Sequence, residues 1–159
     1  ECPWATTGRV GGRKPNIITS LELRSEEMEV INLRIQKKYK EIEEREVRFE
    51  EYLLEDAEYA IVAFGSAARI AKKSIEIARS QGIKVGLLRP ITLWPFPTKE
   101  VQKLAGKVKG ILSLEINAGQ MVEDIRLAVE GKVPVQHFGR LGGIIPDPDE
   151  VVDAIKRLF

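Results

Sequence analysis

The stretch "YAIVAFGSAARIAKKSIEIARSQGIKVGLLR", residues 59–89, decides the fold. It opens with the apolar run 59–64, which is typical of a strand buried on both faces. An amphipathic segment follows and ends at Gly82, which predicts a helix, and a second apolar run occupies 84–89. A strand, a helix and a strand in this order predict two parallel strands joined by a crossover helix.

The same alternation continues to the end of the chain. Further strands are predicted at 110–115 and 133–138, and further helices at 98–107, 119–131 and 147–159. Strands that alternate with helices predict a three-layer α/β fold, with a mostly parallel sheet covered by helices on both faces. We therefore expect residues 57–159 to form the α/β domain.

Two segments precede this domain. Residues 1–24 are rich in glycine and turn-forming residues and predict an extended arm, with one short strand. Residues 25–56 are dominated by charge, and Ser25 followed by two glutamates predicts the start of a long helix over 25–52. Its apolar seam is narrow and oppositely charged residues recur four positions apart, so we interpret it as a solvated strut. A partner-binding arm is the alternative.

The composition limits the classes of function. The 25 basic and 24 acidic residues give a net charge of +1, which favours neither a nucleic acid nor an acidic membrane as partner. No apolar run approaches the roughly 20 residues of a membrane span. The single cysteine, Cys2, cannot alone hold a metal or an iron–sulfur cluster, and it fits a reducing, cytoplasmic compartment. Because the chain starts at Glu1 and not at methionine, we expect native chain upstream.

Polar and special residues follow each predicted strand. In an open α/β sheet, ligands and partners bind at the carboxyl ends of the strands, so these residues are the candidate site. The candidates for an interface or an active-site rim are Arg89, Trp94, Pro95, Phe96, Pro97, Glu115, Asn117 and Gln120. The candidates for binding an anion are Gly65, Ser66, Arg69, Gly139 and Arg140.

Several of these residues also have a purely structural interpretation. Ser66 can serve as the N-cap of its helix, and Glu115 is favoured as a hydrogen-bond acceptor over a catalytic acid. His137, the only histidine, is favoured as a core or edge residue. No nucleophile–base pairing and no metal-ligand spacing occurs, so no catalytic residue and no metal site is assigned.

The loop "LLRPITLWPFP", residues 87–97, concentrates proline and aromatic residues where neither a strand nor a helix can continue. We predict that Trp94 and the segment 95–97 form a rigid, apolar contact surface, because a preorganised loop loses little entropy on docking. Local packing of Trp94 is the alternative.

Five sequence blocks together resemble the C-terminal part of the alpha subunit of 2-oxoacid:ferredoxin oxidoreductases. They are "KYKEIEEREVRFEEY" (38–52), "DAEYAIVAFGSAAR" (56–69), "VGLLRPITLWPFP" (85–97), "EINAGQMVEDIRLAV" (115–129) and "FGRLGG" (138–143). The resemblance implies a domain like the C-terminal domain of transketolase, with a five-stranded mixed sheet and one antiparallel strand. The fifth strand is then either 16–21 or an edge strand that the pattern does not reveal.

The resemblance also implies a function. These enzymes convert a 2-oxoacid and coenzyme A into acyl-CoA, carbon dioxide and reduced ferredoxin, here with 2-oxoglutarate or a branched-chain 2-oxoacid as substrate. The chain would be an assembly domain that contacts the beta, gamma and delta type subunits and binds no cofactor alone. Thiamine diphosphate, Mg²⁺ and the 4Fe-4S clusters are expected elsewhere in the complex, so the isolated chain should be inactive.

Two alternative functions remain open at this point. The first is a freestanding α/β module that binds a nucleotide or coenzyme A through 65–69 and 139–143. The second is an interaction protein that acts through its long helix. An apolar surface made for an absent partner can also pair two copies of the isolated chain, which predicts a homodimer of this piece.

Overall fold

The computed structural model describes residues 8, 10–17 and 19–158. The predictions that fall on residues 1–7, 9, 18 and 159, Cys2 among them, lie outside the described residues. Packing divides the chain into two units, Glu1–Tyr39 and Lys40–Phe159, and each is described by itself. Among the described residues, no helix is both long enough and apolar enough to cross a bilayer.

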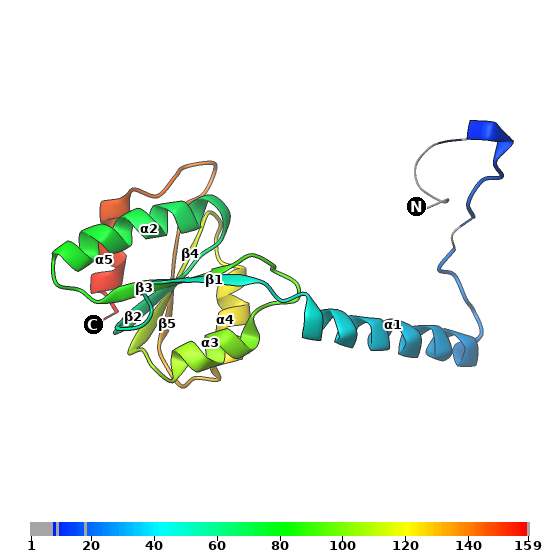
Figure 1. Cartoon of the computed structure of the whole chain (residues 1–159), viewed down its shortest axis with the longest axis horizontal. Coiled ribbons are helices and arrows are strands. Elements are labelled where there is room, and N and C mark those ends of the chain that lie inside the picture. Colours follow the sequence, from blue (N-terminus) through cyan, green and yellow to red (C-terminus); the bar gives the residue numbers. More distant parts are fainter. Residues whose placement is uncertain (1–7, 9, 18, 159) are drawn as a thin grey trace. The chain divides into compact units, whose positions relative to one another are not determined.

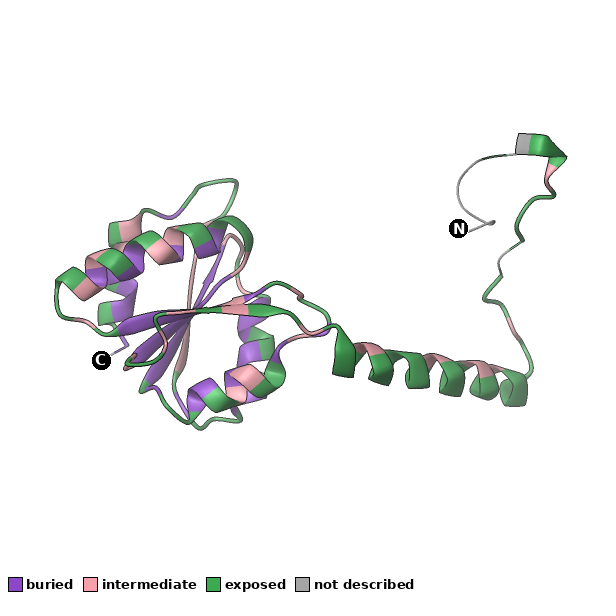
Figure 2. Ribbon diagram, viewed as in Figure 1, coloured by how far each residue is buried: buried purple, intermediate pink, exposed green. Residues whose placement is uncertain are grey.

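The first unit contains a short 3₁₀ helix, η1 (Val10–Gly12), and most of helix α1 (Ser25–Arg45). Two glutamates in the first turn of α1 favour this start, because acidic side chains complement the positive end of the helix dipole. No residue of α1 is buried, as Figure 2 shows. The helix is therefore charged and exposed, as its sequence predicts.

The second unit is built around one five-stranded sheet (Figure 1). Its strands are β1 (Phe49–Tyr52), β2 (Tyr59–Val62), β3 (Val85–Pro90), β4 (Gly110–Glu115) and β5 (Val135–Gly139). The order across the sheet is β1-β3-β2-β4-β5, with β1 antiparallel to β3 and all other pairs parallel. This confirms the predicted α/β fold with a mixed, mostly parallel sheet.

Helices cover both faces of this sheet, as Figures 1 and 2 show. They are α2 (Gly65–Ser80), α3 (Thr98–Ala105), α4 (Met121–Val129) and α5 (Pro148–Lys156). Helices α2 and α5 pack on one face and α3 and α4 on the other. In β2, Ile61 joins the cluster under α2 and α5, whereas Ala60 and Val62 join the cluster under α3 and α4. The three central strands, β2, β3 and β4, are mostly apolar and buried because each face of the sheet lies against helices.

The fifth strand corrects one prediction and decides between two others. Helix α1 ends at Arg45 and not at 52. The antiparallel strand is Phe49–Tyr52, which is the alternative of an edge strand that the pattern does not reveal, and not 16–21. Glu50 lies opposite Arg89 in the register, and their side chains form an ion pair at 2.8 Å. The α/β sheet therefore begins upstream of residue 57.

Candidate functional site

The strand order creates a switch point between β2 and β4. The chain leaves β2 toward β3 on one side, and β4 lies on the other side, so the connections diverge at the carboxyl ends of these two strands. A crevice of about 200 Å³ opens there, lined by Phe64, Gly65, Ser66, Ala67, Glu115, Ile116 and Asn117. The structure thus brings four of the sequence-predicted candidates together at one place.

Glu115 is the buried charge of this site, with 1% of its surface exposed. Its Oε2 accepts hydrogen bonds from the backbone N–H groups of Gln120 (3.0 Å) and Met121 (2.9 Å). Its Oε1 accepts from the N–H of Val122 (3.0 Å) and from the hydroxyl of Ser113 (2.8 Å). The carboxylate therefore caps the N-terminus of α4, where the helix dipole also favours negative charge.

These bonds decide the chemistry of Glu115. Burial by itself raises the pKa of the carboxyl, but the three backbone N–H donors and Ser113 outweigh burial and hold the pKa below its ordinary value of 4.5. A carboxylate that stays ionised and has four donors around it is poorly suited to general acid–base chemistry. The interpretation of Glu115 as a structural acceptor therefore fits its surroundings better than a catalytic one.

His137 and Gly139 of β5 lie close to Glu115 and to the loop that follows it. The Nε2 of His137 lies 3.9 Å from Oε1 of Glu115, and within the described residues this nitrogen is buried without a hydrogen-bond partner. Gly139 lies opposite Glu115 in the register. A Cβ at 139 would stand 2.3 Å from the backbone oxygen of Asn117. The end of β5 therefore requires a residue without a side chain.

The proposed anion-binding residues do not converge. Gly65 and Ser66 line the crevice, but Arg69, Gly139 and Arg140 are not among its lining residues. Arg140 instead lies 3.5 Å from Glu150, in the first turn of α5. The N-cap of α2 is Phe64 and not Ser66, and its side chain makes no capping bond. Ser66 is exposed in the first turn of the helix.

The proline loop between β3 and α3 divides into an inner and an outer part. Pro95 and Pro97 are buried, and Phe96 packs against the core under α3 and α4. The outer part consists of Ile91, Leu93 and Trp94, which are 54%, 47% and 55% exposed. Of the residues predicted to form a contact surface, Trp94 is therefore exposed, whereas Pro95 and Pro97 are buried.

The loop is tied to the segment that precedes β1. The hydroxyl of Thr92 accepts a bond from the N–H of Arg48 (3.0 Å) and donates to the carbonyl of Pro95 (2.9 Å). The N–H of Ile91 donates to the carbonyl of Arg48 (2.9 Å). These contacts hold the exposed apolar side chains on a fixed backbone.

The two remaining rim candidates have structural partners. Arg89 pairs with Glu50, which also binds Lys72 at 2.6 Å, and these two cations lower the pKa of Glu50. Gln120 is exposed, and its backbone N–H donates to the carboxylate of Glu115, which caps α4. Among the described residues, no group of three or more histidine, cysteine, aspartate and glutamate side chains could hold a metal ion.

A larger groove, of about 590 Å³, lies beside the proline loop. Its lining residues are Glu43, Glu44, Val47, Phe49, Trp94, Pro95, Phe96, Thr98, Lys99 and Glu100. Sequence reasoning predicted Trp94, Pro95 and Phe96 as contact residues but missed the four lining residues within 43–49, because it placed that segment inside a continuous helix. The sequence does contain a signal that the helix ends early. No apolar residue lies between Ile42 and Val47, and this gap interrupts the apolar seam of the helix.

Comparisons with known proteins agree with this architecture. Residues 57–151 match the family model "Pyruvate:ferredoxin oxidoreductase core domain II". The ketoisovalerate oxidoreductase subunit VorB of Methanothermobacter thermautotrophicus is 44% identical over 158 residues, which are 99% of this chain and 44% of VorB. The 2-oxoglutarate synthase subunit KorA of Methanothermobacter marburgensis is 30% identical over 104 residues, 65% of this chain and 28% of KorA. The chain thus spans less than half the length of these curated relatives.

Two solved structures share the fold. A 2-oxoglutarate:ferredoxin oxidoreductase from Magnetococcus marinus, with 2-oxoglutarate, coenzyme A and succinyl-CoA bound, superimposes with a TM-score of 0.76 at 22% identity. The match covers 97% of this chain and 28% of that one. A split-gene transketolase, an inactive beta4 tetramer, superimposes with a TM-score of 0.58 at 15% identity over 69% of this chain and 41% of its own. The fold of the chain is that of these oxidoreductase and transketolase-like domains.

Proposed function

Because this chain belongs to the pyruvate:ferredoxin oxidoreductase core domain II family, we propose that it is the C-terminal part of the alpha-type subunit of a multi-subunit 2-oxoacid:ferredoxin oxidoreductase. The complex would cleave a 2-oxoacid, release carbon dioxide, transfer the acyl group to coenzyme A and pass the electrons to ferredoxin. The observation that carries this proposal is the 44% identity to a ketoisovalerate oxidoreductase subunit along 99% of the chain. The complex would operate in the cytoplasm, where a reducing compartment suits a lone cysteine.

A branched-chain 2-oxoacid is the substrate that we favour. The likeness to VorB extends along nearly the whole chain, whereas the 2-oxoglutarate synthase subunit matches over 65% of it at 30% identity. The test is an assay of the complete complex, isolated with this subunit, for coenzyme-A-dependent reduction of ferredoxin. We expect kcat/KM for ketoisovalerate to exceed that for 2-oxoglutarate by at least about tenfold. The reverse preference would overturn the substrate, and no reduction with any 2-oxoacid would overturn the function.

We place thiamine diphosphate, Mg²⁺ and the 4Fe-4S clusters on other parts of the complex. The chain has one cysteine, and a 4Fe-4S cluster needs four thiolates. Glu115, the buried carboxylate of the strand edge, is occupied by four donors of its own domain. The described residues therefore do not fit these groups, and no step of the reaction is assigned to them.

The role of this part of the subunit would be assembly. Large apolar side chains are exposed on two loops that leave the carboxyl edge of the sheet, and clusters of exposed apolar side chains mark interaction sites. They are Ile91, Leu93 and Trp94 after β3 and Leu141, Ile144 and Ile145 after β5. The crevice of about 200 Å³ is smaller than ordinary ligand pockets, which start at roughly 300 Å³. Gly65 and Ser66 would then rim a coenzyme A or anion site that another subunit completes.

Replacing Trp94 by alanine tests the assembly role. Truncating a large aromatic anchor at an interface typically costs a factor of about 10 or more in affinity, so we expect the dissociation constant for the other subunits to rise by at least about that much. The melting temperature should change by less than about 2 °C, because half of the side chain is in solvent. Leu127→Ala on α4, where the side chain is 77% exposed, is the matched control. Equal losses of stability and association would identify Trp94 as a local packing residue.

A further inference from the structure

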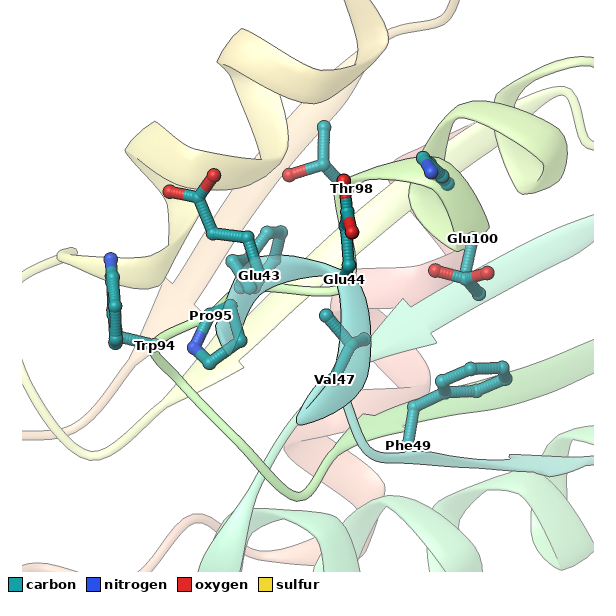
Figure 3. Close-up of a pocket in the computed structure, with 10 residues that line it drawn as sticks. Glu43, Glu44, Val47, Phe49, Trp94, Pro95, Thr98 and Glu100 are labelled. Carbon is teal, nitrogen blue, oxygen red and sulfur yellow. The ribbon is translucent and has the colours of Figure 1, made fainter. Parts of the chain in front are cut away.

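We propose that the groove beside the proline loop binds a segment of another subunit that presents an arginine next to an apolar side chain. The inference rests on the proposed function, since it requires a complex of several subunits. The groove has a volume of about 590 Å³ and lies within the second unit, between the end of α1, the start of β1 and the loop before α3. Figure 3 shows the side chains that line it.

The floor of the groove is apolar. Val47, Phe49, Pro95, Phe96 and Trp94 contribute to it, and Phe49 and Trp94 are 36% and 55% exposed. The floor is held in place because Thr92 and Ile91 bond to the backbone of Arg48. A preformed apolar floor favours an apolar side chain of the partner at little cost in loop ordering.

The rim of the groove is acidic. Glu43, Glu44 and Glu100 contribute carboxylates, and Lys99 contributes an ammonium group. Glu100 lies 3.6 Å from Lys103, but within the described residues neither Glu43 nor Glu44 makes an ion pair. The net charge of the rim is therefore negative, and a cationic partner complements it, whereas a nucleic acid or another anion would be repelled.

The position of the two glutamates strengthens this inference. Glu43 and Glu44 lie in the last turn of α1, which ends at Arg45. Carboxylates at a helix C-terminus face the negative end of the helix dipole, which disfavours them. Arg45 contributes one positive charge to the same turn, and a cation bound in the groove would offset the negative charge that remains on the two carboxylates.

Arginine fits this rim better than lysine. Its guanidinium group can stack on an aromatic ring and at the same time donate paired hydrogen bonds to carboxylates, which the compact ammonium of lysine does less well. In the view of Figure 3, Glu43 and Glu44 stand between Trp94 on one side and Phe49 on the other. The groove therefore offers carboxylates and aromatic faces together, which is the environment of a bound arginine.

The first test removes the two charges from the assembled complex. The double variant Glu43→Gln/Glu44→Gln is compared with Glu29→Gln/Glu41→Gln, which makes the same change of charge at exposed positions of the same helix outside the groove. We expect the dissociation constant for the other subunits to rise at least about tenfold in the groove variant at low salt, and less than about twofold in the control. The difference should shrink in 1 M salt, where charges are screened beyond about 3 Å. Equal effects of the two variants would overturn the proposal.

The second test identifies the occupant directly. A photoreactive benzoylphenylalanine replaces Lys99 at the rim, and the cross-linked peptide of the assembled complex is sequenced by mass spectrometry. We expect a segment of another subunit in which an arginine lies within about two residues of a large apolar side chain. A segment without arginine, a second copy of this chain, or no cross-link in an intact complex would each overturn the proposal. If the wild-type chain assembles with no other subunit, the proposed function fails as well, so the two failures are distinguishable.

Discussion

Replacing Glu115 by alanine is expected to lower the free energy of unfolding by about 3 kcal/mol, because hydrogen bonds to a buried charge contribute about 1.5–3 kcal/mol each and the loss leaves donors unpaired. Three backbone N–H groups at the start of α4 and the hydroxyl of Ser113 would lose their acceptor. Chemical denaturation of the wild-type and variant chains at pH 7 measures the difference.

Two further variants isolate the cause. Glu115→Gln keeps the volume but turns an amide donor toward backbone donors, so we expect it to lose most of the same stability. Glu123→Ala, in the first turn of the same helix, removes an exposed carboxylate and should cost no more than about 1 kcal/mol through the helix dipole. A loss of similar size in Glu123→Ala and Glu115→Ala would contradict the capping role of Glu115.

The same carboxylate makes stability depend on pH. The pKa of Glu115 is lower in the folded chain than its ordinary value of 4.5, because three backbone N–H donors and Ser113 outweigh the effect of burial. Its contribution is therefore fully present above about pH 4.5 and is lost as the pH falls through the lower, folded value. Glu50 and Asp56 add acid-labile contributions of the same sign. The free energy of unfolding should thus fall less between pH 7 and pH 3 in Glu115→Gln than in the wild type.

Periodicity predicted most of the fold because the central strands β2, β3 and β4 are almost entirely buried. The apolar-rich segments 59–64, 84–89, 110–115 and 133–138 each overlap an observed strand. Periodicity did not reveal the edge strand β1, because it pairs with a strand on one side only and two of its four residues, Glu50 and Glu51, are charged. Local sequence at 49–52 is compatible with a helix, and the free edge of β3 decides the outcome.

The candidate site was predictable in its location but not in its roles. Topology alone brings the strand ends Gly65 and Glu115 to one edge, where both line the same crevice. Roles depend on contacts that spacing cannot reveal, such as the pairing of Arg89 with Glu50 across the sheet. Composition also could not separate the buried prolines of the β3–α3 loop from its exposed tryptophan, since all of them belong to one apolar stretch.

Replacing Gly139 by alanine is the second change for which we expect a large effect. A Cβ at this position would stand 2.3 Å from the backbone oxygen of Asn117 and 2.7 Å from Cε1 of His137. Backbone cannot swing away as a flexible side-chain tip can, so either β5 or the loop after Glu115 must shift. Overpacking of this kind costs about 1–3 kcal/mol, and we expect a value near the upper limit.

Gly106→Ala is the matched control. This glycine follows α3 with φ of −79°, and its nearest contact to a new Cβ is 3.5 Å, so alanine should be neutral or stabilise by up to about 1 kcal/mol. Thermal unfolding of both variants measures the contrast. Gly139 has no positive φ, so any loss there reports on space and not on backbone strain.

The loop after Glu115 makes the result of Gly139→Ala informative beyond stability. If Asn117 is displaced, the hydrogen bond from the N–H of Gly119 to the Asn117 side chain (2.7 Å) should weaken. The hydrogen bonds by which Glu115 caps α4 should weaken with it. Amide hydrogen exchange at Gly119 to Val122 should then accelerate in Gly139→Ala and stay unchanged in Gly106→Ala. If stability and exchange were both unaltered, the half-exposed edge strand β5 would shift to make room for the new Cβ at little cost. The geometry of the strand edge would then not depend on the close approach of Gly139 to Asn117.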